Sequence, residues 1–327
     1  MTYKPPYTIT SKMLDDVSKI MKLIGQLSSS ASLDYKPNLR KTNKINSIYS
    51  SLAIENNALS KEQVRDIIDG KLIIGPQKDI TEVKNAIKVY DDILEINPLD
   101  MNDLLKCHRI MMLTLIDDAG KFRKGEEGVF DGDQVIFMAP PAKIVPELMN
   151  NLFDYINHDE ENLLIKSCVF HYEFEFIHPF SDGNGRMGRL FQTCLLAKED
   201  ELFAYLPIES IIKEKQSEYY KVIALSHQEG QSNSFIEFML KAILETIERT
   251  SKDANKQYLY LSAQVKKLIE FMIAGIPYSA LELMDLVGIK SRASFKINYL
   301  DPCLDAGIIK MTISDKPNSR NQRYIKV

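Results

Sequence analysis

The stretch that decides the fold of this chain covers residues 178–189 and reads His178-Pro179-Phe180-Ser181-Asp182-Gly183-Asn184-Gly185-Arg186-Met187-Gly188-Arg189. A helix-like run, residues 190–197, follows it directly. Proline restricts the backbone of the residue before it, so His178 is expected to lie outside the α-helical region. The Gly-Asn-Gly run allows a tight turn with exposed amides at the start of a helix, an arrangement that binds phosphate. The stretch therefore predicts an anion-binding turn beside a histidine.

Four polar side chains of this stretch have the chemistry of a nucleotide site. Arg186 and Arg189 lie three residues apart on the following helix, so both guanidinium groups can reach one polyphosphate. Asp182 remains to hold Mg²⁺ that bridges phosphate oxygens. His178 alone among these groups titrates near neutral pH, which suits a base that accepts a proton from a hydroxyl. Each feature taken singly is more often structural, and their combination is what makes the signal specific.

The stretch resembles the Fic family pattern HPF-x-[DE]-G-N-[GK]-R-x-x-R at every defined position. The resemblance implies an enzyme that moves AMP from ATP, with Mg²⁺, onto a Ser, Thr or Tyr hydroxyl of a target protein. It implies that His178 is the catalytic base and that Asp182 holds Mg²⁺. The residues that would bind the nucleotide are Gly183, Asn184, Gly185, Arg186 and Arg189. Some family members have Lys in place of Gly185, and glycine here favours nucleotide transfer over the phosphorylation typical of the Doc branch.

A second pattern lies upstream, in Ser51-Leu52-Ala53-Ile54-Glu55-Asn56. It is similar to the family's inhibitory pattern [ST]-x-x-x-E-[GN], with Ser51, Glu55 and Asn56 at the defined positions, on a helix expected from about Leu39 to Asn57. The resemblance implies that Glu55 pairs with Arg189 and so keeps the γ-phosphate from docking. The plainer alternative is that Glu55 lies on the surface and pairs with a Lys or Arg of its own helix.

Residues 125–138 contain two short β-like runs around an Asp-Gly-Asp sequence, which predicts a β-hairpin. The position of this hairpin matches the family's flap, which receives the target backbone as an added strand. The candidates for holding the target are Ile136, Phe137 and Met138, with the alternative that they only cover the core. The resemblance also implies that Phe180 anchors the motif in the core.

The same region fits two weaker interpretations. Gly183, Gly185 and Gly188 spell the dinucleotide fingerprint GxGxxG. However, these glycines do not directly follow the preceding strand-like alternation, and residues 205–250 are expected to be helical without a second parallel strand. A metal site at His171, Glu175 and His178 is also disfavoured, because the spacing is not HExxH and Pro179 removes His178 from the helix. We therefore expect a helix over residues 163–177 and a structural role for His171.

Apolar residues at three- and four-residue spacing predict helices at 85–94, 104–115, 143–157, 209–226 and 234–249. The expected fold class is mainly α: a Fic-type helical core with a short β-hairpin flap, plus a C-terminal winged-helix domain. The flap is the one sheet element expected before residue 300. The winged helix is expected from helices near 262–274, 279–287 and 291–305, the last kinked or ended by Pro302, and from a two-stranded wing at 307–313 and 322–327.

These elements predict three domains along the chain. They are an N-terminal helical region with the inhibitory helix (1–97), a Fic catalytic core (98–250) and a winged-helix-like domain (258–327). Residues 251–257 are polar and lack an apolar stripe, so they are expected to form a linker.

Overall composition limits the expected partners and location. The 327 residues carry a formal net charge of −4, so no global basic field draws the chain to nucleic acid or to a membrane. No uncharged apolar run reaches the length of a spanning helix, which predicts a cytoplasmic protein. The four scattered cysteines lack metal or disulfide spacing and are expected to be buried thiols: Cys107, Cys168, Cys194 and Cys303. A second copy of the chain, as a target or in an oligomer, is left open as a partner.

The C-terminal part supports a rival function weakly. From residue 258 onward it has ten Lys or Arg and six Asp or Glu. The side chains expected on its recognition helix are Ser291, Arg292, Ser294, Lys296 and Asn298, which is compatible with contact to a DNA backbone. Asp301 and Asp305 at the end of that helix would repel phosphate. The alternatives to AMP transfer are therefore a DNA-binding regulator whose Fic core senses nucleotide, or a Fic enzyme that uses another nucleotide or removes AMP.

Overall fold

Helices form most of the regular structure in the computed structural model, which describes residues 3–29, 37–131, 134–260, 262–317 and 319–326. The contacts within the chain divide it into two compact units. The first contains residues up to 24 and residues 43–247, and the second contains residues 25–42 and 248 onward. The mainly α fold class expected from the sequence is confirmed. The division of the first unit into an N-terminal region and a catalytic core at residue 97 stays a prediction.

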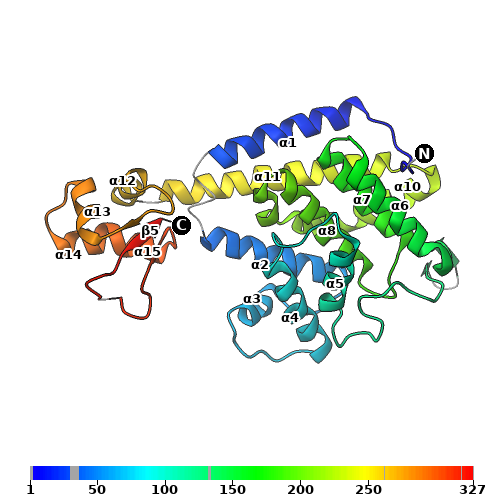
Figure 1. Ribbon diagram of the computed structural model, residues 1–327, viewed down its shortest axis with the longest axis horizontal. Helices are drawn as coiled ribbons and strands as arrows, with labels where there is room; N and C mark the ends of the chain where they lie inside the picture. The colour runs from blue at the N-terminus through cyan, green and yellow to red at the C-terminus, as the bar shows by residue number, and fades with distance from the viewer. Residues whose placement is uncertain (1–2, 30–36, 132–133, 261, 318, 327) are drawn as a thin grey trace. The chain divides into compact units, whose positions relative to one another are not determined.

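The first unit contains the motif and most of the helices (Figure 1). The elements up to the end of α11, of which α1, α2 and α11 extend into the second unit, are α1 (Ser11–Ser29), α2 (Pro37–Ile54), α3 (Lys61–Ile68), α4 (Gln77–Asp91), α5 (Met101–Met111), β1 (Gly128–Asp131), β2 (Gln134–Met138), the 3₁₀ turn Ala142–Ile144, α6 (Val145–His158), α7 (Leu163–Ile177), α8 (Asn184–Glu199), the 3₁₀ turn Glu201–Tyr205, α9 (Ile208–Glu214), α10 (Gln216–Glu229) and α11 (Asn233–Tyr260). The single helix expected at 209–226 is wrong in one respect, because Lys215 interrupts it between α9 and α10.

Helices α7 and α8 lie side by side in the core of the first unit (Figure 1). Helix α7 carries apolar residues on all sides, and such a helix is stable only when it is buried. Phe170 of α7 and Phe191 of α8 are fully buried, and their rings stack with centroids 6.2 Å apart. Helix α7 begins after Asn162, whose side chain accepts a hydrogen bond from the amide of Leu164, and ends at His178. The two packed helices therefore carry the motif turn between them.

The hairpin predicted at residues 125–138 is present as the antiparallel strands β1 and β2. Gly128 pairs with Met138 and Val129 with Phe137, and the register shifts by one residue directly after Val129. Such a shift inserts an extra residue into one strand and bends the ribbon locally.

The second unit contains helices and a small sheet in the order expected for a winged helix, and its assignment as a winged helix stays a prediction. Its elements after α11 are α12 (Ala263–Phe271), β3 (Pro277–Tyr278), α13 (Ala280–Val287), α14 (Arg292–Phe295), the π-helical turn Lys296–Leu300, α15 (Asp301–Asp305), β4 (Ile309–Met311) and β5 (Tyr324–Lys326). The strands form one antiparallel sheet in the order β3-β5-β4. Leu268, Leu283, Phe295 and Cys303 are among the buried residues of its core.

Two details of this unit differ from the sequence-based expectations. Strand β3 adds a sheet element before residue 300, so the flap is not the only one there. Two residues are too short a run to show the alternation that marks a strand in sequence. The expected kink at Pro302 takes the form of the π-helical turn directly before it, since proline has no amide hydrogen to donate.

The linker expected at residues 251–257 is wrong, because α11 continues without a break to Tyr260. The segment Ser-Lys-Asp-Ala-Asn-Lys-Gln contains neither glycine nor proline, so nothing in it ends a helix. Its polar composition had been taken as a sign of irregular structure, whereas a helix needs an apolar stripe only where it packs against a core.

The remaining expectations about the chain as a whole concern thiols and membranes. All four cysteines are free and buried, as predicted. Within the described residues, each helix is too short or too polar to traverse the hydrocarbon core of a bilayer.

Glu173 of α7 is a buried carboxyl that connects this helix to the N-terminal segment. Glu173 is 4% exposed, and its carboxyl group accepts a hydrogen bond of 3.2 Å from the hydroxyl of Tyr3. Burial raises the pKa of Glu173 from 4.5 to about 7, and the bond from Tyr3 opposes this shift. The folded protein thus holds this proton more tightly than the unfolded chain, so the free energy of unfolding falls as the pH rises from 4.5 to about 7.

We expect Glu173→Gln to raise the free energy of unfolding at about pH 8 by up to about 3 kcal/mol, because Gln keeps an acceptor for Tyr3 and removes a buried charge. At about pH 4 the carboxyl is protonated in the folded protein, and the two proteins should differ little. Denaturant unfolding at both pH values measures this difference. An equal gain at both pH values would show that the charge is not its cause.

Candidate active site

His178 lies at the C-terminal end of α7 in a left-handed conformation, with φ 50° and ψ 60°. The proline after it does keep it out of the α-helical region, but in a conformation that residues other than glycine rarely adopt. The imidazole Nδ1 lies 3.4 Å from the carbonyl oxygen of Glu175. A carbonyl can only accept a hydrogen bond, so Nδ1 carries a proton in this contact, and in the neutral ring the lone pair is then on Nε2. The ring is therefore in the tautomer that a base acting through Nε2 requires.

Arg123 holds the backbone on either side of His178. Its Nε donates to the carbonyl of His178 at 2.7 Å, Nη2 donates to the carbonyl of Ile177 at 3.3 Å, and its own amide donates to the carbonyl of Pro179 at 2.9 Å. The same guanidinium donates to the carbonyls of Gly125 and Pro140, which lie just before β1 and just after β2. One buried side chain thus connects both ends of the hairpin to the candidate base.

Phe180 and Asn184 fix the turn after His178. Phe180 is fully buried, and its ring stacks on that of His108 with centroids 3.6 Å apart and an interplanar angle of 5°. The amide of Phe180 donates to the Asn184 side chain at 2.9 Å, and that side chain donates back to the carbonyl of Phe180 at 2.8 Å. Asn184 therefore shapes the turn with its side chain, and its side-chain amide group is not turned toward a ligand.

His108 of α5 contacts the backbone of the same turn. Its Nε2 donates to the carbonyl oxygen of Asp182 at 2.9 Å, and its Nδ1 accepts from the amide of Gly120 at 2.8 Å. This arrangement requires a neutral ring. Burial provides it by lowering the pKa of His108 to about 4.

Arg189 and Glu55 form an ion pair between the motif helix α8 and the end of α2. The Nη2 of Arg189 lies 2.7 Å from Oε1 of Glu55, and Arg189 is 2% exposed. Nε and Nη2 also donate to the hydroxyl and the carbonyl of Ser51, at 3.1 and 3.0 Å. Burial alone would lower the pKa of Arg189, but Glu55, Tyr219 and Glu175 raise it above its ordinary value. The structure thus brings Glu55 to Arg189 rather than to a basic residue of its own helix.

Glu55 reaches Arg189 from a turn and not from a helix. Helix α2 ends at Ile54, three residues before the expected end at about Asn57. Asn56 has φ 64°, a left-handed conformation that glycine and asparagine tolerate best. This turn gives a physical reason for the [GN] position of the sequence pattern.

Gly183 and Gly185 are required by close contacts at the start of α8. Gly183 has φ 88°, and a Cβ there would lie 2.8 Å from the sulfur of Met112. A Cβ on Gly185 would overlap Oε1 of Glu55 and lie 2.9 Å from Nη1 of Arg189. The ion pair of Glu55 and Arg189 thus lies directly against the backbone of the turn.

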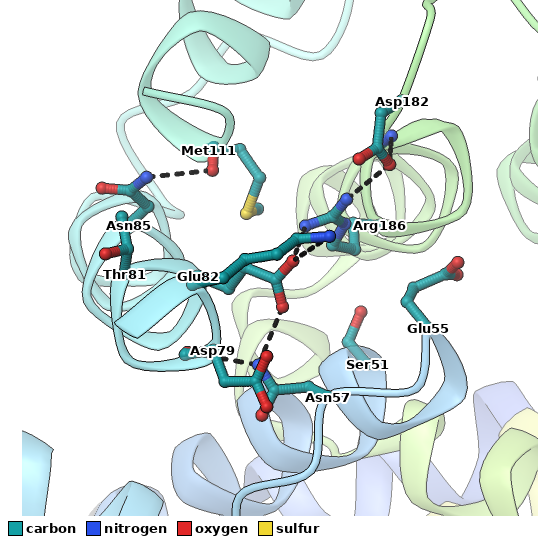
Figure 2. Close-up of polar contacts among 12 residues, drawn as sticks. Ser51, Glu55, Asn57, Asp79, Thr81, Glu82, Asn85, Met111, Asp182 and Arg186 are labelled. Carbon is teal, nitrogen blue, oxygen red and sulfur yellow. Dashed lines mark hydrogen bonds and ion pairs between the residues drawn. The ribbon is translucent and has the colours of Figure 1, made fainter. Parts of the chain in front are cut away.

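Arg186 is held by two other carboxylates, as Figure 2 shows. Its Nη2 donates to Oδ1 of Asp182 at 2.7 Å, and its Nη1 lies 3.4 Å from Oε1 of Glu82 on α4. Arg186 is 3% exposed. Its buried Nε and Nη1 have no hydrogen-bond partner within the described part of the chain. Arg186 and Arg189 are therefore each paired with separate acids in this structure.

Asp182 is engaged by its neighbours and yet accessible. Its Oδ1 accepts from Arg186 and, at 2.5 Å, from the amide of Gly183, while the side chain is 43% exposed. Among the described residues, no three His, Cys, Asp or Glu side chains gather into a metal site. Mg²⁺ at phosphate sites takes one or two carboxylates and completes its shell with phosphate oxygens and water. A single exposed carboxylate beside an anion-binding turn fits that requirement.

The three flap candidates cannot be compared in full. The side chains of Ile136 and Phe137 lie outside the described residues, and Met138 is 50% exposed. The amide of Ala139 donates to the carbonyl of Glu127 at 3.0 Å, which continues the pairing beyond the strands.

His171 has the contacts of a structural residue. It is fully buried, with Nδ1 2.7 Å from Oε1 of Gln192 and Nε2 3.0 Å from the hydroxyl of Tyr219. Both ring nitrogens are therefore occupied by protein groups.

Three residues around the motif had no predicted role: Arg123, His108 and Glu82. The side chains of Arg123 and His108 bond backbone atoms of other residues, and no residue pattern specifies such partners. Glu82 did leave a signal, since it falls at helical spacing before the buried residues Ala86 and Val89 of α4. A charged residue on the buried face of an amphipathic helix calls for a partner.

Comparison with known proteins covers both units. The profile of the Fic/DOC family matches residues 98–196, and the profile of the Filamentation induced by cAMP protein Fic-like, C-terminal domain, matches residues 263–325. The solved structure of a Fic family protein from Desulfovibrio desulfuricans G20 is 41% identical to this chain. The match covers 99% of this chain and 98% of that one, with a TM-score of 0.75.

Two curated relatives share part of the chain. Protein adenylyltransferase fic-1 of Caenorhabditis elegans is 27% identical over 255 residues, which is 74% of this chain. Protein adenylyltransferase Fic of Aedes aegypti is 31% identical over 218 residues, which is 62% of this chain. The matched stretches span 47% and 41% of these relatives, less than half of either. The solved relative matches nearly the whole chain and both Fic profiles match within it, so this chain belongs to the Fic family.

Proposed function

We propose that this protein transfers AMP from ATP to a Ser, Thr or Tyr hydroxyl of a target protein, and that Glu55 restrains the reaction. The observation that supports this most directly is the contact of Glu55 with Arg189 at the motif turn. A buried arginine at an anion-binding turn whose donors are taken by an acidic side chain is a phosphate site with a competitor in place. The names of the curated relatives support the same reaction.

His178 would act as the base. Its Nδ1 is committed to the carbonyl of Glu175, so Nε2 takes the proton from the target hydroxyl. The hydroxyl oxygen then forms a bond to the α-phosphorus of ATP while the bond from that phosphorus to the β-phosphate oxygen breaks. Pyrophosphate leaves, and the proton rests on His178. Arg123 would keep the imidazole and the hairpin in fixed relation during this step.

The phosphates would be bound by the start of α8. The amides of Gly183, Asn184 and Gly185 lie at the N-terminus of this helix, where backbone donors and the helix dipole favour anions. Arg186 and Arg189 would add charge-assisted bonds to the β- and γ-phosphates. Mg²⁺ held by Asp182 would neutralise part of the negative charge on the phosphate oxygens.

The flap would present the target. Addition of a target strand to β1 or β2 supplies main-chain hydrogen bonds without demanding a particular sequence. Met138, half-exposed at the end of β2, is the flap candidate whose side chain is described, with Ile136 and Phe137 proposed beside it.

We expect Glu55→Gly to raise the transfer of label from labelled ATP with Mg²⁺ by about ten- to a hundredfold, since a charge-assisted bond contributes about 1.5–3 kcal/mol. Glu160→Gly serves as the control, because Glu160 is an exposed loop residue away from the motif. No gain with Glu55→Gly, or an equal gain with the control, would refute the restraint. A mass spectrum of the labelled proteins identifies the nucleotide transferred and shows any self-modification.

In the Glu55→Gly protein, we expect the further change His178→Ala to abolish label transfer while ATP binding remains. The base would be lost, whereas the phosphate-binding groups Arg186 and Arg189 would be kept. Transfer rate and ATP affinity, measured on the same preparation, separate the two effects. Persistent transfer without the imidazole would refute the role of His178. Salt-dependent binding to duplex DNA with no label transfer from the Glu55→Gly protein would instead favour the DNA-binding regulator.

A further inference from the structure

We infer that Asn57 is a positioning residue for the inhibitory glutamate, and that it acts by bonding Glu82, the carboxylate that also pairs with Arg186. This inference rests on the proposed restraint by Glu55. The contacts of Asn57 concern how the turn that carries Glu55 is held in position, whereas the ion pair with Arg189 is the contact that the turn allows Glu55 to make.

The turn is attached to α4 immediately after Glu55. Nδ2 of Asn57 donates to Oε2 of Glu82 at 2.8 Å and to the carbonyl of Asp79 at 3.2 Å. The next amide, that of Ala58, donates to the carboxylate of Asp79 at 2.9 Å. Figure 2 shows Asn57 between the end of α2 and the two acidic residues of α4. A displacement of Glu55 from Arg189 must therefore strain or break this attachment.

Only Asn56 separates the attachment from Glu55. The amide of Asn57 also donates to the carbonyl of Leu52 at 3.1 Å, which closes the end of α2 around the left-handed Asn56. Few backbone dihedral angles lie between Glu55 and Asn57, so fixing Asn57 also restricts the positions that Glu55 can take. The place of Asn57 against α4 thus sets the place of the Glu55 carboxylate against Arg189.

Glu82 is shared between this attachment and the motif. One of its oxygens accepts from Asn57, and the other lies 3.4 Å from Nη1 of Arg186. Glu82 and Arg186 are 7% and 3% exposed, so solvent does little to replace either partner. Residues 55–57 therefore engage both motif arginines, Arg189 directly through Glu55 and Arg186 indirectly through Asn57 and Glu82.

The hydrogen bond from Asn57 goes to Glu82, a carboxylate that also contacts the motif residue Arg186. Asn57 could satisfy its amide with the carbonyl of Asp79, yet it also bonds the one carboxylate of α4 that pairs with the motif. Arg186 also donates to Asp182 through Nη2, so a phosphate that binds this guanidinium would compete with Glu82 and Asp182. The attachment of the turn and the binding of phosphate thus meet at one carboxylate.

The test compares Asn57→Ala in two backgrounds, the natural protein and the Glu55→Gly variant. In the natural protein, loss of the bond to a charged acceptor should loosen the turn and raise label transfer about tenfold. In the Glu55→Gly protein, no restraint remains to be loosened, so the same change should alter transfer by less than about twofold. ATP affinity should rise in the first background and stay the same in the second.

Asn85→Ala is the matched control. Asn85 lies on the same helix as Glu82, is buried, and also donates two hydrogen bonds, to the carbonyls of Met111 and Leu113 at 3.3 and 2.9 Å. Its loss should lower thermal stability without raising transfer. Asn57→Asp is the second variant, since it keeps the size of the side chain and places a like charge against Glu82. It should raise transfer at least as much as Asn57→Ala.

The outcomes separate this inference from the function on which it rests. Activation by Glu55→Gly without activation by either Asn57 variant would overturn the inference and leave the proposed restraint intact. Equal activation in both backgrounds, or activation by Asn85→Ala as well, would also overturn it. No activation by Glu55→Gly itself would overturn the restraint, and the inference with it.

Discussion

A buried guanidinium needs an anion, and the site is arranged around that requirement at Arg189. Removing a charged group from water costs several kcal/mol unless a counter-charge and hydrogen bonds replace the solvent. Glu55 and Ser51 supply both, and they come from α2 and the turn directly after it, which lie far from α8 in the sequence. The proposed substrate would supply a negative charge of the same kind. Because one guanidinium can pair fully with only one of these anions at a time, the contact that stabilises this structure would also oppose the proposed nucleotide.

The rest of the turn is held by groups that a ligand does not replace. Arg123 bonds backbone carbonyls on both sides of His178, Asn184 closes the turn through the backbone of Phe180, and His108 supports the carbonyl of Asp182 as a neutral ring. These contacts are made with main-chain atoms or buried rings, so a phosphate in place of Glu55 would leave them intact. Under the proposed function, the site would combine a turn that is shaped before the substrate arrives with an ion pair that the substrate replaces.

The motif residues stand out in the sequence because their types and spacing suit an anion-binding turn, whereas Glu55 was predicted only through the resemblance to the family's inhibitory pattern. Glycine at 183, arginines three apart and asparagine at 56 reflect local backbone geometry, and local geometry leaves a trace in sequence. Arg123, Asn57 and the partner choice of Glu82 depend on which helices meet, so no short pattern reveals them. The continuous helix through 251–257 was missed for a related reason, since polarity indicates solvent and not the end of a helix.

Gly185 shows how one position can join the chemistry of the site to its restraint. A side chain there would overlap the oxygen of Glu55 that accepts from Arg189, so this ion pair in its observed geometry requires glycine. A lysine at the same place would overlap the glutamate through its Cβ and add a positive charge beside Arg189. Residue 185 and the segment 51–56 are therefore physically dependent on each other, although 128 residues lie between Asn56 and Gly185 in the sequence. A change of residue at Gly185 would therefore affect both the group that the turn is proposed to bind and the ion pair on which the proposed restraint depends.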